Sequence, residues 1–351
     1  MVIKTIAKHS SRNSSIELLR IICMLFVVAQ HVIVFGIKPE WRVDGFFGGS
    51  DYVLSHALFG LFVTAVDVFV LISGWFAIKW HPRKLVSMWI MALFWSWIMA
   101  ALRLSSGGGI KENLKYILPI TSREFWFISV YFILCLLAPA LNRVVENSTR
   151  RQLGILVLVL CGVTYCWATI SYVFNFPQII PDYGGGIVNF VTLYLTARWL
   201  RLYGSTKFKT WQLIAMLVGI QVLTQIFQLA YSHLLGFPFT AFENDNSLPC
   251  FLSAVTILLL FTRMTFHSRI INLLAVNCLA VYVLHMNDVA WPFIVRAFHL
   301  EGLTGWNIVA VCVVVPIIVY MVGIVMEAMR KILMGQVESI VLGKTFKKEL
   351  R

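Results

Sequence analysis

The sequence predicts an all-α protein, a polytopic integral membrane helical bundle with about ten transmembrane helices. Of its 351 residues, 59% are hydrophobic and 13% charged, and the mean hydropathy is +0.82, whereas soluble domains are about 25% charged. Ten long apolar runs are spread along the chain, and none alternates every second residue as a membrane barrel strand does. This composition excludes a disordered chain, a secreted disulfide scaffold and a DNA-binding domain.

Each run is long enough for a membrane helix, which needs about 20 mostly apolar residues to cross roughly 30 Å of hydrocarbon. We expect one membrane-embedded domain over residues 1–351, with tails at 1–17 and 330–351. The first run has no small-residue cleavage site after it, so we expect a retained helix and no signal peptide. The predicted spans are 18–37, 54–78, 85–102, 125–141, 153–173, 187–202, 211–235, 248–264, 270–290 and 307–329.

Ten crossings place both termini on one side of the membrane, and the basic residues indicate which side. With the termini in the cytoplasm, 22 of the 29 Lys and Arg residues lie in cytoplasmic segments and 7 lie outside. Cytoplasmic loops carry an excess of Lys and Arg, so we expect both termini inside. The net charge of +13 then mostly reflects topology, and no nucleic acid partner is expected. The histidines lack the paired spacing of a zinc site, so no metal is expected either.

The first span carries an arginine and a histidine on one face. Arg20 lies at its cytoplasmic edge and His31 comes eleven residues later, which returns His31 to within about 20° of Arg20 and places it roughly 16 Å deeper. Ionisable groups inside a membrane are costly and are usually functional. The alternative is a packed histidine and an arginine that only anchors the helix end.

The second span adds Asp67, a carboxylate within the apolar stretch AVDVFVLISGWFAIK. Its depth is close to that of His31, so a contact could hold the imidazole in the tautomer that acts as a base. We therefore predict Asp67 as a partner of His31. The alternative is that Asp67 accepts a hydrogen bond from a neighbouring helix.

The turn KWHPRKL follows that span and contains four basic side chains, Lys79, His81, Arg83 and Lys84. Such a turn is common on the cytoplasmic side of membrane proteins. It also suits an anion clamp for a phosphorylated cofactor.

Four segments together resemble acyltransferase family 3, membrane proteins that include bacterial O-acetyltransferases acting on cell-surface polysaccharides. They are the Arg20 and His31 pair, VDVFVLISGWF, FWFISVYFILCLLAPALN and LAVYVLHMN. They occur in the family's order, and the resemblance covers about residues 14–329.

The resemblance implies a multi-pass enzyme of the bacterial plasma membrane that moves an acetyl group from cytoplasmic acetyl-CoA to a hydroxyl. The acceptor would be a surface glycan or its lipid-linked precursor, and membrane lipid the other partner. His31 would be the essential histidine, as base or acyl relay, with Arg20 as its partner. The phosphates of coenzyme A would lie near Arg20, Arg83, Lys84, Arg150 and Arg151.

The chemistry of acyl transfer assigns further side chains. A sugar hydroxyl needs a base, and a thioester carbonyl that becomes negative needs hydrogen-bond donors. Trp126, Tyr131, Ser73 and a backbone amide near Gly74 are the candidate donors, and Trp126 and Tyr131 are predicted to bind substrate. His285 lies about 22 Å from the cytoplasmic face and is predicted to bind the acceptor sugar or to bond a neighbouring helix.

Two other functions fit the same residues. A transporter or flippase of a lipid-linked sugar also lines a polar path with His, Asp and Arg. A family member that uses another acyl donor, such as succinyl-CoA, has the same sequence features.

Overall fold

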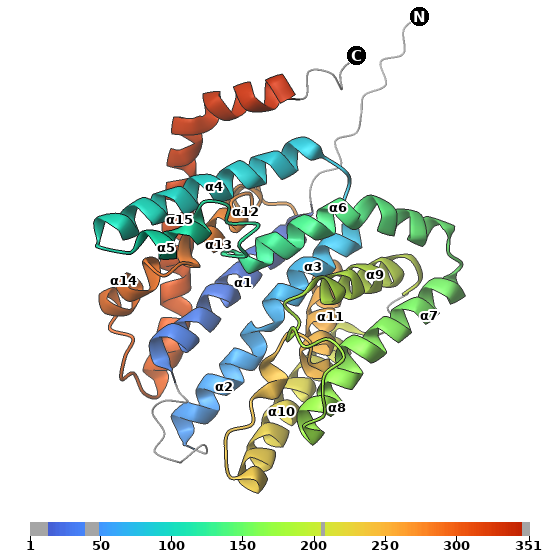
Figure 1. Cartoon of the computed structure of the whole chain (residues 1–351). Coiled ribbons are helices and arrows are strands. Elements are labelled where there is room, and N and C mark those ends of the chain that lie inside the picture. Colours follow the sequence, from blue (N-terminus) through green and yellow to red (C-terminus); the bar gives the residue numbers. More distant parts are fainter. Residues whose placement is uncertain (1–12, 39–48, 205–207, 346–351) are drawn as a thin grey trace, which may run out of the picture.

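The computed structural model describes residues 13–38, 49–204 and 208–345, and every regular element in these ranges is a helix (Figure 1). Most of the predicted tail at 1–17 and the last six residues of the predicted tail at 330–351 lie outside the described residues. The elements are α1 (Ser14–His31), η1 (Val32–Ile37), α2 (Ser50–Phe62), α3 (Thr64–Phe76), α4 (Pro82–Ser105), α5 (Ile110–Asn113), η3 (Leu114–Tyr116), α6 (Trp126–Asn147), α7 (Arg150–Cys161), η4 (Gly162–Cys166), α8 (Trp167–Phe174), α9 (Ile187–Tyr203), α10 (Thr210–Leu235), η5 (Ala241–Glu243), α11 (Leu248–Thr262), α12 (Arg269–Ala275), α13 (Cys278–His285), α14 (Ala290–Ala297) and α15 (Trp306–Thr345).

The described chain contains eight helices long and apolar enough to cross a membrane, and a ninth if the bent pair α13–α14 counts as one span. The prediction of an all-α polytopic membrane bundle is therefore confirmed. Two of the ten predicted runs do not form a single helix of the length needed to cross the membrane. The run at 187–202 forms α9, which has 17 residues and is only about 26 Å long. The run at 270–290 is divided among α12, α13 and the break before α14, and α13 and α14 meet at 88°.

α1 and α3 form the centre of the bundle. α3 packs against α9 and α11, while α1 packs against α12, α13 and α15 (Figure 1). α10 buries few of its side chains, and Ile214, Val218 and Val222 are exposed along it. Exposed aliphatic side chains on a membrane helix face lipid, so α10 lies at the rim and α1 and α3 hold the polar interior.

The close contact between α3 and α9 depends on Gly74. A Cβ atom at this position would lie 2.5 Å from the carbonyl oxygen of Tyr194 and 2.9 Å from the Cβ of Ala197. The Tyr194 hydroxyl group also accepts a hydrogen bond from the backbone N–H of Ile78, just after α3, at 3.0 Å. The contact thereby fixes the end of α3 and the start of the basic turn.

α1 and α15 extend into the segments predicted as tails. α1 begins at Ser14, where the Asn13 side chain accepts a hydrogen bond from the Ser15 backbone at 3.1 Å and caps the helix. α15 continues to Thr345, past the predicted end at residue 329. Arg330 is paired with Glu327 at 2.8 Å and with Glu338 at 3.2 Å, so charges that would favour a loop are satisfied within the helix.

Candidate active site

Two histidines meet inside the bundle. His31 ends α1 and His285 ends α13, and they are 9% and 1% exposed. Nδ1 of His31 lies 3.1 Å from Nε2 of His285, and Nδ1 of His285 lies 2.7 Å from the carbonyl oxygen of Val281. The elements α1 and α13, which are far apart in the sequence, therefore bring the two imidazoles together.

The Val281 carbonyl determines the tautomer of both rings. A carbonyl oxygen only accepts hydrogen bonds, so Nδ1 of His285 carries the hydrogen and Nε2 of the neutral ring is an acceptor. Nδ1 of His31 then donates to it, which leaves Nε2 of His31 unprotonated in the neutral pair. His31 is held as the form that accepts a proton at Nε2.

The predicted contact between His31 and Asp67 is wrong. Asp67 is fully buried on α3, and its Oδ1 accepts a hydrogen bond from Nδ2 of Asn189 at 3.2 Å. Its Oδ2 has no hydrogen-bond partner among the described residues, and there Asp67 and His31 share no hydrogen bond. His285 occupies the orienting position, because α13 ends beside the end of α1 while α3 directs Asp67 toward α9.

Two aromatic rings enclose His31 on the side away from Arg20. Phe35 stacks on the imidazole with ring centroids 5.5 Å apart, and Trp291 meets it edge-on at 6.0 Å. Trp291 also lies 6.2 Å from His285 and is 6% exposed. Its indole Nε1 is buried without a hydrogen-bond partner in the described chain. A donor beside the imidazole pair is therefore unused, a feature that the sequence does not signal.

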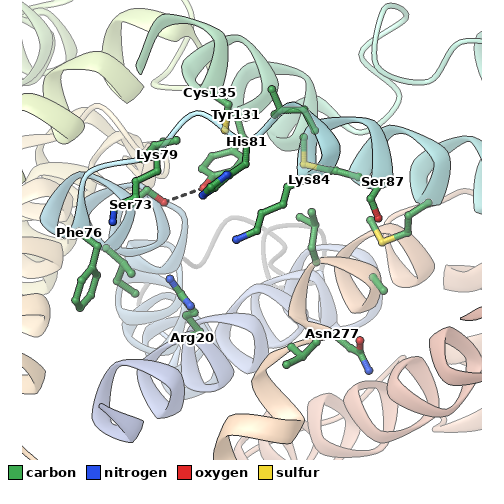
Figure 2. Close-up of a pocket in the computed structure, with 18 of the residues that line it drawn as sticks. Arg20, Ser73, Phe76, Lys79, His81, Lys84, Ser87, Tyr131, Cys135 and Asn277 are labelled. Carbon is green, nitrogen blue, oxygen red and sulfur yellow. Dashed lines mark hydrogen bonds between the residues drawn. The ribbon is translucent and has the colours of Figure 1, made fainter. Parts of the chain in front are cut away.

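A basic cavity of about 620 Å³ opens at the Arg20 end of α1, between the basic turn and α15. Arg20 and Lys84 point from opposite sides toward its open middle (Figure 2). The Arg20 guanidinium donates to Glu17 at 3.0 Å. The basic side chains that line the cavity are Arg20, Lys79, His81, Lys84, Arg330 and Lys331.

Two of the five residues predicted to bind the cofactor, Arg20 and Lys84, line this cavity, whereas Arg83, Arg150 and Arg151 are not among its lining residues. Arg150 starts α7 and lies over the ring of Tyr203 at 6.0 Å. Arg330 and Lys331 were not predicted, because their place in the cavity depends on α15 continuing as a helix beyond the apolar run.

A narrower apolar cavity of about 200 Å³ continues from the basic one. Ser73 and Tyr131 lie where the two cavities meet, and their hydroxyl groups are 3.1 Å apart (Figure 2). The narrow cavity reaches Val27, one helical turn before His31, and Tyr282, whose ring lies 6.0 Å from that of His285. It thus leads from Arg20 toward the imidazole pair.

The predicted substrate residues fall in different places. Tyr131 lines both cavities, and His285 contacts His31. Trp126 starts α6, where its ring packs on that of Phe190 at 6.4 Å, and it lines neither cavity.

A second opening lies at the opposite end of α1. This outer hollow has a volume of about 820 Å³ and includes Phe35 and Trp291, the two rings that enclose His31. The imidazole pair therefore lies between the narrow cavity and the outer hollow.

An ion cluster holds the break between α13 and α14, three residues after His285. Asp288 accepts from Arg103 at 2.7 Å and from Lys115 at 3.1 Å, and Lys115 also pairs with Glu124 at 3.0 Å. Burial alone would lower the pKa of Lys115, but its hydrogen bonds to Glu124 and Asp288 outweigh burial and raise that pKa. The cluster ties the break to the ends of α4 and α6.

The fold and the site define a multi-pass membrane protein with a buried imidazole pair between two openings. The family model of the acyltransferase domain of acyltransferase family 3 matches residues 13–326. The chain belongs to this family and is a membrane acyltransferase, as the resemblance predicted. Neither a curated protein nor a solved structure matches the chain.

Proposed function

We propose that this membrane acyltransferase is an O-acetyltransferase of the bacterial plasma membrane. It moves an acetyl group from cytoplasmic acetyl-CoA to a hydroxyl of a surface glycan or of its lipid-linked precursor. The observation that carries the proposal is the position of His31, whose Nε2 is unprotonated and which lies between the narrow cavity and the outer hollow.

The two connected cavities match the two halves of coenzyme A. Its nucleotide end carries several phosphate charges, which suit a cavity lined by Arg20, Lys79 and Lys84. Its pantetheine arm is thin and mostly uncharged, which suits the narrow apolar cavity that ends near Val27 and Tyr282. With the nucleotide held near Arg20, the thioester lies near His31.

The imidazole pair supplies the base. Nε2 of His31 takes the proton of the acceptor hydroxyl while the hydroxyl oxygen attacks the thioester carbon. The C–S bond breaks in the next step. The departing thiolate of coenzyme A takes the proton back from His31. In the charged intermediate Nδ1 of His31 still donates to His285, so the cation keeps its partner. In a relay mechanism the same lone pair of His31 first attacks the thioester carbon, and the C–S bond breaks with release of the thiolate. The hydroxyl oxygen then attacks the acetyl carbon, the N–C bond breaks, and the hydroxyl proton passes through His31 to the thiolate.

Trp291 is placed to stabilise the negative oxygen of the tetrahedral intermediate. Its Nε1 is an unpaired buried donor next to both imidazoles. Donors aimed at a developing oxyanion typically contribute about 10²- to 10³-fold in rate. Ser73 and Tyr131, the donors suggested by the sequence, bond to one another farther toward the basic cavity.

The test uses the full chain in vesicles, with radiolabelled acetyl-CoA supplied on the Arg20 side. Membranes from a strain that lacks the protein supply the acceptor. We expect label in glycan or lipid-linked saccharide. The label is expected to be lost in His31→Ala and retained in His56→Ala, which removes a buried histidine outside the imidazole pair. Transfer from succinyl-CoA at the same rate would contradict the acetyl donor. Absence of labelled product from every acyl donor, or unchanged transfer by His31→Ala, would contradict the proposed reaction.

A further inference from the structure

The outer hollow combines aromatic and charged side chains in a space of about 820 Å³, which falls within the usual range for a site that binds a small ligand. Phe35 and Trp291 form its wall toward His31, with ring centroids 5.2 Å apart. Aromatic faces pack well on the C–H faces of a sugar ring. A sugar ring packed on Phe35 and Trp291 is separated from the imidazole pair only by these two side chains.

The hollow is lined by two cationic side chains, Lys38 and Arg296, and by the single acid Glu301, with His299 beside them. Lys38 follows the end of α1 and η1, whereas Arg296 lies near the end of α14. Two parts of the chain that are far apart in the sequence therefore place basic groups around one space.

Topology does not account for these cations. In the predicted orientation Lys38 and Arg296 are on the outer side, which holds only 7 of the 29 Lys and Arg residues, and orientation signals favour basic residues on the cytoplasmic side. Arg296 and His299 are also exposed, so they are accessible to a ligand in water. Their convergence requires an explanation other than membrane insertion.

We propose, on the basis of the function proposed above, that the outer hollow binds an acceptor saccharide bearing a negatively charged group, a carboxylate or a phosphate. Arg296 holds the charged group in the hollow that Lys38 also lines, and Trp291 and Phe35 hold the ring. A guanidinium presents a fork of donors that matches either anion. Binding the charge at the rim directs a neighbouring hydroxyl toward His31.

The test measures binding directly and needs no catalysis. Fluorescently labelled trigalacturonate, a neutral galactotriose and galactose 1-phosphate are titrated onto the full chain in neutral-lipid nanodiscs. We expect trigalacturonate to bind at least ten times more tightly than galactotriose. The galactose 1-phosphate titration shows whether the hollow prefers a phosphate to a carboxylate.

The variant Arg296→Gln is expected to weaken binding of the acidic probes about tenfold, the loss of one charge-assisted contact. Lys111→Gln removes an exposed basic residue of α5 that lies outside the hollow, and it is expected to leave binding unchanged. Equal binding of acidic and neutral probes, no binding of either acidic probe, or equal effects of Arg296→Gln and Lys111→Gln would overturn the proposal.

The same samples separate this proposal from the proposed function. If acidic probes require Arg296 while acetyl transfer survives His31→Ala, the hollow is an anion site and the reaction assignment fails. If transfer requires His31 while the neutral probe binds as well as the acidic ones, the reaction stands and the charged acceptor is excluded.

Discussion

The hydrogen-bond chain from Val281 through His285 to His31 gives each of its residues a single role. The carbonyl orients His285, and His285 orients His31. Removing His285 leaves the buried Nδ1 of His31 without its acceptor, so the ring is free to turn or to change tautomer. The two histidines therefore act as one unit in which only His31 meets the reactants.

A double-mutant cycle checks this dependence. We expect His285→Ala to lower acetyl transfer about 10²-fold and His31→Ala to lower it at least as much, in the range of general base catalysis. The double variant is expected to be no slower than His31→Ala, because His285 acts only through His31 and its removal costs nothing once His31 is gone. Initial transfer rates in vesicles provide the measurement. Losses that multiply in the double variant would show that the histidines act independently.

Trp291→Phe separates the indole N–H from the indole shape. Since Nε1 has no described partner, its removal breaks no hydrogen bond, and the thermal unfolding temperature is expected to stay within a few degrees of the parent value. Transfer is expected to slow by roughly ten- to a hundredfold with little change in the KM for acetyl-CoA. An unchanged rate would exclude Trp291 as the oxyanion donor.

The sequence made part of the site predictable at the residue scale. Arg20 and His31 share one helix, so the helical repeat alone places them on one face. His31 and His285 are 254 positions apart, and no local pattern indicates that α1 and α13 end side by side. The depth of Asp67 was predicted from its span, but depth does not specify the direction in which its side chain points.

At the scale of elements, the break after α13 shows how a short polar segment divides an apolar run. Oδ1 of Asn287 accepts hydrogen bonds from the backbone N–H groups of Val289 at 3.0 Å and Ala290 at 2.8 Å, which holds a turn between the end of α13 and the start of α14. Hydropathy averaged over twenty residues does not register Asn287 and Asp288. The predicted span at 270–290 therefore ran through a turn that positions His285.

The contact between α3 and α9 gives a prediction about stability. Gly74→Ala would place a methyl group against the Tyr194 backbone, and the helices must separate, which costs roughly 1–3 kcal/mol. Gly219→Ala is the matched control, because a Cβ on α10 meets nothing within 4 Å. Thermal unfolding in detergent compares the two variants. Equal unfolding temperatures would show that α3 and α9 do not need close approach at Gly74.

At the scale of the whole molecule, α15 illustrates the difference between an apolar helix and a membrane span. It covers Trp306–Thr345, 40 residues, or about 60 Å, which exceeds the roughly 30 Å of hydrocarbon. The part after Arg330 therefore extends beyond the bilayer, where Arg330 and Lys331 line the basic cavity. Composition predicts that the helix crosses the membrane, but tertiary contacts determine where the segment after Arg330 lies.

The predicted orientation is tested by labelling from each side. In a Cys166→Ser background, which removes the exposed native thiol, Glu301→Cys is expected to react with an impermeant maleimide in intact cells. Ser339→Cys, exposed near the end of α15, is expected to react only after permeabilisation. The reverse pattern would place the basic cavity outside and would contradict the predicted topology.

The position of His31 between two openings also determines the electrical balance of each turnover. In the proposed reaction a proton leaves an alcohol on one side and joins a thiolate on the other, while the acetyl group crosses in the opposite direction without the electron pair that stays on sulfur. The two transfers compensate each other, so each turnover is electrically neutral. We expect the extent of acetyl transfer to be unchanged in vesicles with an imposed potassium diffusion potential, whereas a dependence on voltage would mean that a further charge crosses with the acetyl group.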